Sequence, residues 1–521
     1  MLRTRAGPVP GGVVPRLLAL AVPVLLWACG DEGPAGPRVR PPALVGVSPS
    51  GAHPFDSPLE IRLTGQNLAG ARVDGPPHLF LEVLDRSSTS LRLRAGFRGG
   101  PPGPAWIRVE SGGGRDSLAF TIQPLAHGDS LTETRALWVS RFEYASREDL
   151  VRIMAQAGEA GFNLVYLQVR GRADAFYRSA HEPWAHNLTG VLGRDPGWDP
   201  LEVGVEEAGK WGMELHAWIN AFTGWAGTTP PPVSEPLHAF LEHPDWVMVA
   251  QDGTPMPYQS GTRWLTPGHP GVRARMAAVA ADIARKYEVG GIHLDFARYP
   301  DPGYSWDVPS LAAYDSARAL EPGLGFDEMR RRFVTLAVAE TRDSLKAVDP
   351  WAHLSAAVWG IYRNDRGWSG VSTGYGSVLQ DAREWDRLGI VDALAPMVYW
   401  PMTPDYGDRL DFAYLADEHA SAVTSPVFVG MYVPGMDGTS LVRHVERARM
   451  AGAEGMAVFS YSSLESGGLW GPLRMWGFHW PARRFRQSER WFSEAWGPTQ
   501  FTTGSSRTME NGWPLGSSMA R

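Results

Sequence analysis

Two hydrophobic patterns divide the chain near residue 130. Before that point, short runs alternate apolar and polar residues, and turn residues separate the runs. Side chains of a strand point to opposite faces in turn, so this alternation predicts strands that bury one face only. The runs are residues 59–63, 79–83, 91–94, 106–109 and 118–122. They predict a small all-β sandwich of the immunoglobulin-like type over residues 43–124.

Beyond residue 134, apolar strand candidates alternate with helical stretches. The strand candidates are residues 136–142, 163–169, 214–221, 291–296, 354–359, 393–399, 427–432 and 456–461. Apolar residues recur with the period of an amphipathic helix in residues 147–160, 272–287, 327–347 and 440–451. Eight strands with helices between them predict an α/β fold, a (β/α)₈ TIM barrel that occupies residues 130–496.

The longest predicted loop, residues 222–270, follows the third barrel strand. It contains two aromatic motifs, His243–Trp246 and Trp264–Pro267. Loops of this length in compact domains are more often functional than ornamental, so we expect this loop to contribute to function.

One short segment points to the chemistry of the barrel. Residues 290–300 read GGIHLDFARYP, which predicts a buried strand that ends at a single carboxylate. Period-two alternation places His293 and Asp295 on the same face of this strand. Catalytic residues of (β/α)₈ barrels lie at the carboxyl ends of the strands. Asp295 is therefore the leading candidate for a catalytic group.

The same alternation gives the inward faces of other strands. Those faces comprise Tyr166, Gln168 and Arg170 on the second strand, His216, Trp218 and Asn220 on the third, and Ala395, Met397 and Tyr399 on the sixth. Barrel interiors are normally filled with branched apolar residues, so these strand ends predict a polar pocket with aromatic walls. For His216 or His293 taken alone, a core histidine is the better interpretation.

The first residues have the features of an export signal. Three arginines precede an apolar run at residues 17–28, which is too short to span a bilayer as a mature helix. The run ends in LWACG, which resembles a bacterial lipobox whose cysteine, here Cys29, becomes lipidated. We expect residues 1–29 to be a lipoprotein signal peptide. A plain signal peptide with an incidental cysteine is the alternative.

This resemblance implies an exported bacterial lipoprotein of the cell envelope, in the periplasm or on the outer membrane surface, held to the membrane through Cys29. Residues 30–42 are rich in Gly and Pro and predict an extended linker. Residues 497–521 are rich in Ser, Gly and Thr and predict a disordered tail.

Composition narrows the choice of partners. The chain has 521 residues, of which 44% are hydrophobic and 20% charged, as in globular proteins. Its net charge of −7 gives no general attraction to nucleic acid or anionic lipid, so we expect no nucleic-acid partner. The chain also carries 22 tryptophans, whose flat faces suit sugar rings, although most of them should fill the core.

Several separated motifs of the barrel occur in the order of a known family. In chain order they read ETRALWVSRF, LVYLQVRGRADAFYRSAHEPW, GRDPGWDPLEVGVEEAGKWGMELHAWINAF, GGIHLDFARYP and DALAPMVYW. Together they resemble the glycosyl hydrolase-like 10 family through residues 134–465, which implies a (β/α)₈ barrel that acts on glycans. The sandwich, through VGVSPSGAHPFDSPLEIRLTGQNLAGA, resembles the IPT/TIG module, usually a spacer or a binding platform.

The family's motifs map onto particular residues of this chain. The matching positions are Asp295, Arg298, Tyr299 and Pro300 after strand four, Gln168, Arg170, Asp174 and Tyr177 after strand two, and His216, Trp218 and Asn220 on strand three. Many relatives have a second Asp directly after the strand-four acid, whereas this chain has Phe296. A mechanism that needs adjacent aspartates is therefore in doubt, and the partner of Asp295 should come from another strand.

Hydrolysis of a glycosidic bond usually takes two carboxyl groups, one as proton donor and the other as nucleophile or base. We predict Asp295 as one of these two groups and rank Asp174 first for the other, without assigning the two roles. Glu143 and Asp365, at the ends of strands one and five, are weaker candidates. Asp392 precedes strand six and should lie at the opposite, stabilising face of the barrel.

Other residues of the predicted mouth are assigned to substrate binding. They are Gln168, Arg170, His216, Trp218, Asn220, His293, Arg298, Trp359, Tyr399 and Trp400. The aromatic members are candidate platforms for sugar rings, and at least one of them should only pack. For Arg298, pairing with a carboxylate is as good an interpretation as contact with the substrate.

The prediction is therefore an O-glycosyl hydrolase that acts on a cell-envelope or extracellular polysaccharide, such as a peptidoglycan-type glycan, without a cofactor or metal ion. Two alternatives stay open. A metal-dependent hydrolase would use His216, His293 and Asp295 as ligands, although no metal-binding spacing supports it. A non-catalytic, surface-anchored glycan-binding protein would account for Phe296 and the missing adjacent acid.

Overall fold

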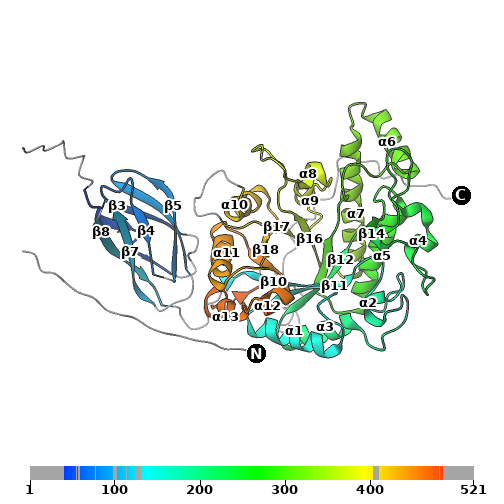
Figure 1. The fold of residues 1–521 in the computed structure, drawn as a ribbon, viewed down its shortest axis with the longest axis horizontal. Coiled ribbons are helices and arrows are strands. Elements are labelled where there is room, and N and C mark those ends of the chain that lie inside the picture. Colours follow the sequence, from blue (N-terminus) through cyan, green and yellow to red (C-terminus); the bar gives the residue numbers. More distant parts are fainter. Residues whose placement is uncertain are drawn as a thin grey trace, which may run out of the picture.

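The computed structural model shows a β-sandwich and a larger α/β barrel (Figure 1). It describes residues 40–53, 56, 59–76, 78–97, 102–112, 114–124, 131–402, 410–479 and 482–484. The predicted signal peptide with Cys29, residues 30–39 of the predicted linker and the predicted tail at 497–521 lie outside these residues. The lipid anchor therefore stays a prediction.

The sandwich consists of two four-stranded sheets, with strand orders β1-β3-β6-β5 and β2-β8-β7-β4. The strands are β1 (Ala43–Ser48), β2 (Gly51–Ala52), β3 (Leu59–Gln66), β4 (Arg72–Asp74), β5 (Leu79–Arg86), β6 (Ser90–Phe97), β7 (Gly103–Ser111) and β8 (Gly114–Ile122). Along β7, buried Ala105, Ile107 and Val109 alternate with exposed residues, which is the predicted one-sided pattern. The all-β region is confirmed, and its likeness to IPT/TIG modules stays a prediction.

Eight parallel strands close into a barrel in chain order. They are β10 (Thr134–Val139), β11 (Leu164–Arg170), β12 (Glu214–Asn220), β15 (Gly291–Asp295), β16 (His353–Trp359), β17 (Ala393–Met397), β18 (Phe428–Tyr432) and β19 (Gly455–Phe459). The predicted (β/α)₈ barrel is therefore confirmed.

Helices connect the strands and cover the outside of the barrel (Figure 1). They are α1 (Arg147–Glu159), α2 (His186–Thr189), α3 (Pro200–Lys210), α4 (Ala239–Glu242), α5 (Pro270–Lys286), α6 (Val308–Leu320), α7 (Phe326–Val348), α8 (Gly374–Ser377), α9 (Ala382–Arg387), α10 (Phe412–Ala422), α11 (Gly438–Met450), α12 (Tyr461–Ser466) and α13 (Trp470–Pro472). The four helices named from the sequence appear as α1, α5, α7 and α11. In the described part of the chain, no helix combines the length and the apolar character needed to cross a membrane.

Local sequence explains where α1 begins. The hydroxyl of Ser146 accepts a hydrogen bond from the amide of Asp149, and the Asp149 carboxylate accepts one from the amide of Ser146. This capping box satisfies backbone donors that the first helical turn leaves without partners.

The barrel interior has its own apolar cluster. It consists of Ala136, Trp138, Leu164, Tyr166, Trp218, Ala357, Ala395 and Ala457. Large rings on β10, β11 and β12 thus share the interior with alanines on β16, β17 and β19. Because large and small side chains complement each other, the interior is filled and ligands have access only from the ends.

The long loop after β12 folds back over the barrel. Its strands β13 (Thr223–Gly227) and β14 (Gln259–Trp264) pair antiparallel, and α4 and a 3₁₀ turn at Pro244–Trp246 lie between them. The ring of Trp264 is centred 5.6 Å from that of Phe296, directly after β15. The loop therefore packs against the end of the strand that carries Asp295.

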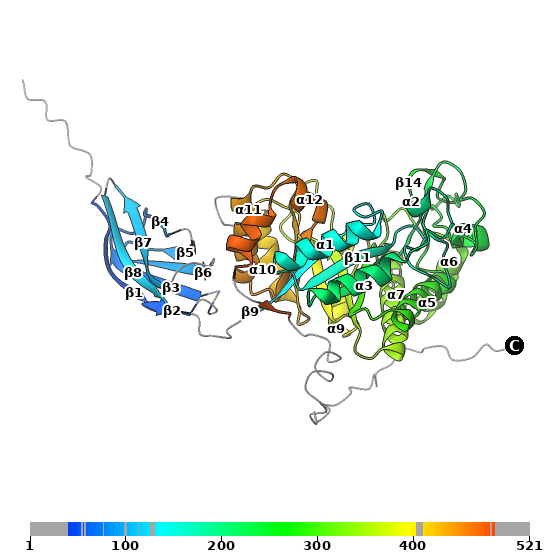
Figure 2. The same ribbon diagram turned by 90° about the horizontal axis from the view of Figure 1, so that it is seen from below.

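The sandwich contacts the barrel along α10 and α11, beside which it lies in Figure 1 and Figure 2. Arg94 of β6 lies 3.5 Å from the carboxylate of Asp417 on α10. An added Cβ on Gly96 would sit 3.1 Å from an oxygen of Glu446 and 3.3 Å from the sulfur of Met450, both on α11. The two parts therefore pack closely along this contact.

Candidate active site

The barrel mouth centres on Asp295, the last residue of β15. Its Oδ1 accepts hydrogen bonds from the Phe296 amide at 2.6 Å and from Nη1 of Arg298 at 3.1 Å. Phe296 has a φ of 52°, a left-handed conformation that turns the chain out of the sheet. The Asp295 side chain is 10% exposed. The carboxylate is thus fixed in orientation and still reachable from solvent.

Arg298 holds Asp295 from within an aromatic stack. Its guanidinium carbon lies 4.3 Å from the ring centre of Phe296 and 5.2 Å from that of Trp359. Such cation–π contacts hold a guanidinium in place. Arg298 therefore pairs with a carboxylate, the first of the two roles left open by the sequence. Phe296, in the place of a second Asp, serves as its platform.

Three side chains at the ends of β17, β18 and β19 form an aromatic wall: Tyr399, Tyr432 and Phe459. The ring centre of Tyr399 lies 5.3 Å from that of Tyr432 and 5.9 Å from that of Phe459. Burial raises the pKa of Tyr399 well above its usual range, and the negative charge of Asp295 adds to this shift. Tyr399 therefore stays protonated beside Asp295. Sequence reasoning missed Tyr432 and Phe459. Each is the last residue of its strand, and the alternation along that strand places it on the inward face.

Gln168, Trp218 and Asn220 form one hydrogen-bond network next to Asp295. Oδ1 of Asn220 accepts hydrogen bonds from Nε2 of Gln168 and Nε1 of Trp218, both at 3.0 Å. Asn220 is the register partner of Asp295, and the amide of Ala221 donates to the Asp295 carbonyl at 2.7 Å. The three predicted residues are thus brought together, and their buried network orients the strand ends around Asp295.

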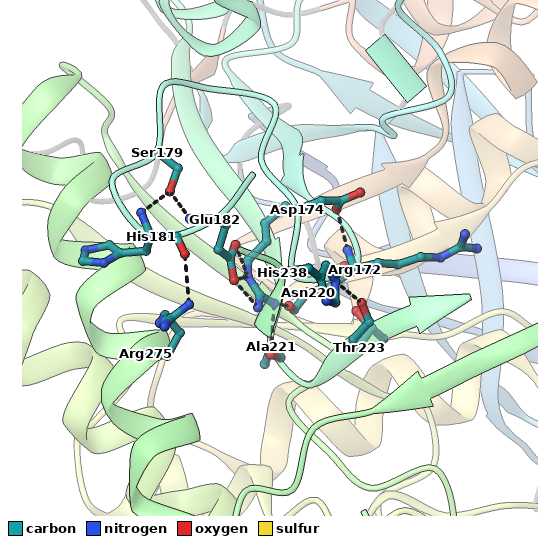
Figure 3. A network of polar contacts seen from close by, with 12 residues as sticks. Arg172, Asp174, Ser179, His181, Glu182, Asn220, Ala221, Thr223, His238 and Arg275 are labelled. Carbon is teal, nitrogen blue, oxygen red and sulfur yellow. Dashed lines mark hydrogen bonds and ion pairs between the residues drawn. The ribbon is translucent and has the colours of Figure 1, made fainter. Parts of the chain in front are cut away.

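Asp174 closes the turn that follows β11. Its Oδ1 accepts hydrogen bonds from the amides of Gly171 at 3.2 Å and Arg172 at 2.7 Å (Figure 3). The Gly171 carbonyl accepts a hydrogen bond from Nδ2 of Asn220 at 3.3 Å. Asn220 thus links the Asp174 turn to its own register partner, Asp295. Both predicted acids are anchored at the same end of the barrel.

Arg141, two residues after the end of β10, is a residue that sequence reasoning missed. It is buried against Gly171, where an added Cβ would sit 2.6 Å from Nε of Arg141. Burial lowers the pKa of Arg141, and the negative charge of Asp174 opposes that shift. A cation therefore lies near each predicted acid. The only sequence signal for Arg141 is its place after the first barrel strand.

Arg170 does not face the mouth, contrary to the prediction. A register shift between Gln168 and Arg170 interrupts the alternation that the prediction assumed. The fully buried guanidinium binds Glu182 at 2.6–2.9 Å and donates to the carbonyls of Asn220 and Ala221. The structure thus gives Arg170 a supporting role behind the strand ends in place of the predicted substrate contact.

His216 and His293 belong to the barrel interior and not to the mouth. Nε2 of His293 accepts a hydrogen bond from Nε1 of Trp138 at 3.0 Å, so its Nδ1 carries the proton and donates to Ser355 at 2.9 Å. His216 lies nearer the amino-terminal end, 3.0 Å from Nη1 of Arg484. Burial lowers the pKa of both histidines. Both are core groups, as expected for either histidine alone, and their assignment to substrate binding is corrected.

The metal-ligand alternative gains no support from the geometry. Among the described residues, no group of three or more His, Cys, Asp or Glu side chains is placed to hold a metal ion. Both ring nitrogens of His293 already have hydrogen-bond partners, which occupies the lone pair that a metal would need.

The weaker acid candidates have other surroundings. Glu143 accepts a hydrogen bond from the hydroxyl of Ser460 at 2.6 Å and so ties the ends of β10 and β19 together. Asp365 is exposed in the loop after β16. Asp392 accepts a hydrogen bond from the amide of Leu354 at 2.8 Å, at the amino-terminal end of the barrel where the sequence placed it.

A cavity of about 440 Å³ opens beside the aromatic wall. Tyr399, Trp400 and Tyr432 line it, so two of the predicted sugar platforms border free volume. Trp218, in contrast, is only 5% exposed and packs inside the barrel.

Comparisons with known proteins show the family to which the barrel is similar. The family model described as glycosyl hydrolase-like 10 matches residues 133–444. The chain is 29% identical over 302 residues to glycosyl hydrolase YngK of Bacillus subtilis (strain 168) and 28% identical over 263 residues to glycosyl hydrolase DigH of Escherichia coli (strain K12). These matches cover 54% and 47% of this chain and 57% and 56% of those proteins, so the chain spans little more than half of their length.

A search of solved structures finds the glycoside hydrolase domain of PgaB (BpsB) from Bordetella bronchiseptica. It aligns with a TM-score of 0.48 at 14% identity and covers 66% of this chain and 98% of that domain.

Proposed function

This chain belongs to the glycosyl hydrolase-like 10 family, and from that premise we propose that it is an O-glycosyl hydrolase with Asp295 as a catalytic carboxylate. One observation carries the proposal. Asp295 ends a barrel strand, is oriented by Arg298, and lies in a mouth lined by the aromatic wall. Mouths at this end of a (β/α)₈ barrel are where such enzymes carry out their chemistry.

The proposed substrate is a polysaccharide of the cell envelope or the extracellular space. The expected export signal and lipidation of Cys29 would bring the barrel to such glycans. Aromatic side chains at the mouth supply flat, partly apolar faces of the kind that stack on sugar rings.

We assign the second carboxyl group to Asp174. It lies on the turn after β11 and is linked to Asp295 through Asn220. One of the two acids would protonate the leaving oxygen, and the other would act as nucleophile or base. A carboxyl separation of about 5–5.5 Å would give retention of configuration, and about 6.5–9.5 Å would give inversion.

The first test replaces each acid by its amide. Asp295→Asn and Asp174→Asn keep the side-chain shape but remove the ionisable group, so each should lower the release of reducing ends by about 10²–10⁴-fold. The substrates are peptidoglycan strands and a panel of exported and plant polysaccharides. Asp365→Asn, which removes an exposed carboxylate, is the matched control and should stay close to wild-type activity.

Activated aryl glycosides assign the two roles. A leaving group that departs without a proton makes the general acid dispensable, so only the variant of the proton donor should recover activity on such substrates. Full activity of folded Asp295→Asn would refute its catalytic role. Glycan binding without any release of reducing ends would favour the non-catalytic glycan-binding protein.

A further inference from the structure

The cavity beside the aromatic wall has the size and lining of a ligand site. Its volume of about 440 Å³ lies within the usual range for small-molecule pockets, roughly 300–1,000 Å³. It opens between the loops after β17 and β18 and shares Tyr399 and Tyr432 with the aromatic wall. A chain of sugars that lies across Asp295 and past the wall would therefore reach it.

Arg443 of α11 brings to this cavity a positive charge that is not held in an ion pair within the described residues. Among the described residues that line the cavity, it is the only Arg or Lys. It is exposed, and within the described part of the chain its guanidinium has no hydrogen-bond or ion-pair partner. Its recorded contact is with the ring of Phe80 from the sandwich, 6.0 Å from the guanidinium carbon to the ring centre.

The lining also holds Asp437 and His444, and each has a hydrogen-bond partner on α11. Asp437 accepts a hydrogen bond from the Ser440 amide at 2.7 Å, so its carboxylate caps the amino terminus of α11. Nδ1 of His444 donates to the Ser440 carbonyl at 2.7 Å. Burial lowers the pKa of His444, which leaves its ring neutral at pH 7.

Packing of the sandwich fixes the helix that carries Arg443. Arg447, one turn later on the same face of α11, binds the carboxylate of Asp417 and lies 3.8 Å from Glu82 of β5. The sandwich therefore holds the outer side of α11 while Arg443 borders the cavity.

We propose that this cavity is a subsite for a carboxylate-bearing sugar and that Arg443 binds its carboxylate. The proposal deepens the proposed function and rests on it for the identity of the ligand as a glycan. A guanidinium presents paired N–H groups that match a carboxylate, and the neighbouring rings of Trp400 and Tyr432 offer faces for the sugar. Because the whole chain carries a net charge of −7, attraction of an acidic glycan depends on a local cation such as this one.

The test compares acidic oligosaccharides with their methyl esters, in which a methyl group replaces the negative charge of the carboxylate. The probes are oligogalacturonate, hyaluronan fragments and peptide-free peptidoglycan strands, and titration calorimetry on the Asp295→Asn protein measures binding without turnover. At least one acid should bind about tenfold more tightly than its ester. Adding Arg443→Gln should bring that ratio close to one, and Arg443→Lys should retain part of it.

Arg285→Gln is the matched control, because Arg285 is exposed on α5, away from α11 in both overall views. It removes the same charge and should leave the ratio unchanged. The proposal is overturned if no acid binds more tightly than its ester, or if Arg443→Gln keeps the preference. A failure of the proposed function would give a different result. The wild type would then cleave none of the glycans, while the preference for the acid and its dependence on Arg443 would persist.

Discussion

At the scale of single residues, charge pairs in this barrel have two distinct uses. Asp295 and Arg298 meet at a partly open mouth, where one carboxylate oxygen is held and the group stays within reach of a substrate. Arg170 and Glu182 are fully enclosed, with side chains 0% and 1% exposed. A pair removed from water in this way stabilises only while both partners are present, because either charge alone is buried without compensation.

Removing Arg170 should therefore cost stability more than substrate affinity. Arg170→Met leaves the Glu182 carboxylate buried alone and should lower the free energy of unfolding by about 3–5 kcal/mol. The double variant Arg170→Met/Glu182→Leu should regain part of that loss, since no charge is left without a partner. Urea unfolding measures both. If Arg170→Met instead raised KM and left stability unchanged, the result would support the substrate contact expected from the sequence.

At the scale of elements, each barrel strand carries different chemistry at its two ends. On β12, Asn220 ends the strand beside Asp295, whereas His216 lies near its start and contacts Arg484. His353, the first residue of β16, lies in the same group, 3.4 Å from Arg484. The carboxyl ends thus form the mouth, and the amino ends form a polar floor that Arg484 enters from the carboxyl-terminal part of the chain.

This floor predicts a pH dependence of stability. Burial, with the positive charge of Arg484 as the next cause, lowers the pKa of His353 to about 3. The unfolded chain binds a proton here near pH 6.5, and the folded protein does not until about pH 3. The free energy of unfolding should therefore fall as the pH drops through that window, by at most about 1.4 kcal/mol per pH unit for this residue.

His353→Gln removes that contribution and should flatten the dependence between pH 6 and pH 4, as measured by urea unfolding at several pH values. His186→Gln, which replaces an exposed histidine of α2, is the control and should keep the wild-type slope. An equal slope in the wild type and in His353→Gln would contradict the role of His353.

At the scale of the whole molecule, the sandwich and the barrel have separate cores and share one closely packed contact. Gly96 of β6 lies against Glu446 and Met450 of α11, where an added Cβ would already make tight contacts of 3.1 and 3.3 Å. Arg94 and Glu82 add charged contacts to Asp417 and Arg447 on either side. We therefore expect the two parts to unfold together.

Gly96→Leu should separate them without a change inside the barrel. Overpacking at this contact should lower the free energy of unfolding by about 1–3 kcal/mol and split one calorimetric transition into two. Gly70→Leu is the matched control, because no atom lies within 4 Å of an added Cβ there. A single transition at the wild-type temperature in Gly96→Leu would show that the contact does not couple the two parts.

Local patterns were enough to predict most of the elements and their order. Apolar runs and turn residues gave five of the sandwich strands (β3, β5, β6, β7 and β8), the eight barrel strands and helices such as α1 and α7, because strand and helix periods are properties of neighbouring residues. They did not give β1, β2 and β4. The position of Asp295 at a strand end followed from the same pattern. Alternation also gave the inward faces of the four strands for which they were predicted, the second, third, fourth and sixth, except where the register shift before Arg170 interrupts it.

Alternation does not predict how far along the barrel axis a side chain lies. It also does not predict which residues from distant segments come into contact. It placed His216 and Asn220 on one face, and only the closed barrel separates the floor from the mouth. Arg141 beside Asp174 and Arg443 beside the cavity are neighbours only after folding. The sequence by itself therefore determined the barrel and its leading acid. Tertiary structure decided which groups share the mouth, because those distances depend on strand stagger and on the packing of residues far apart in the chain.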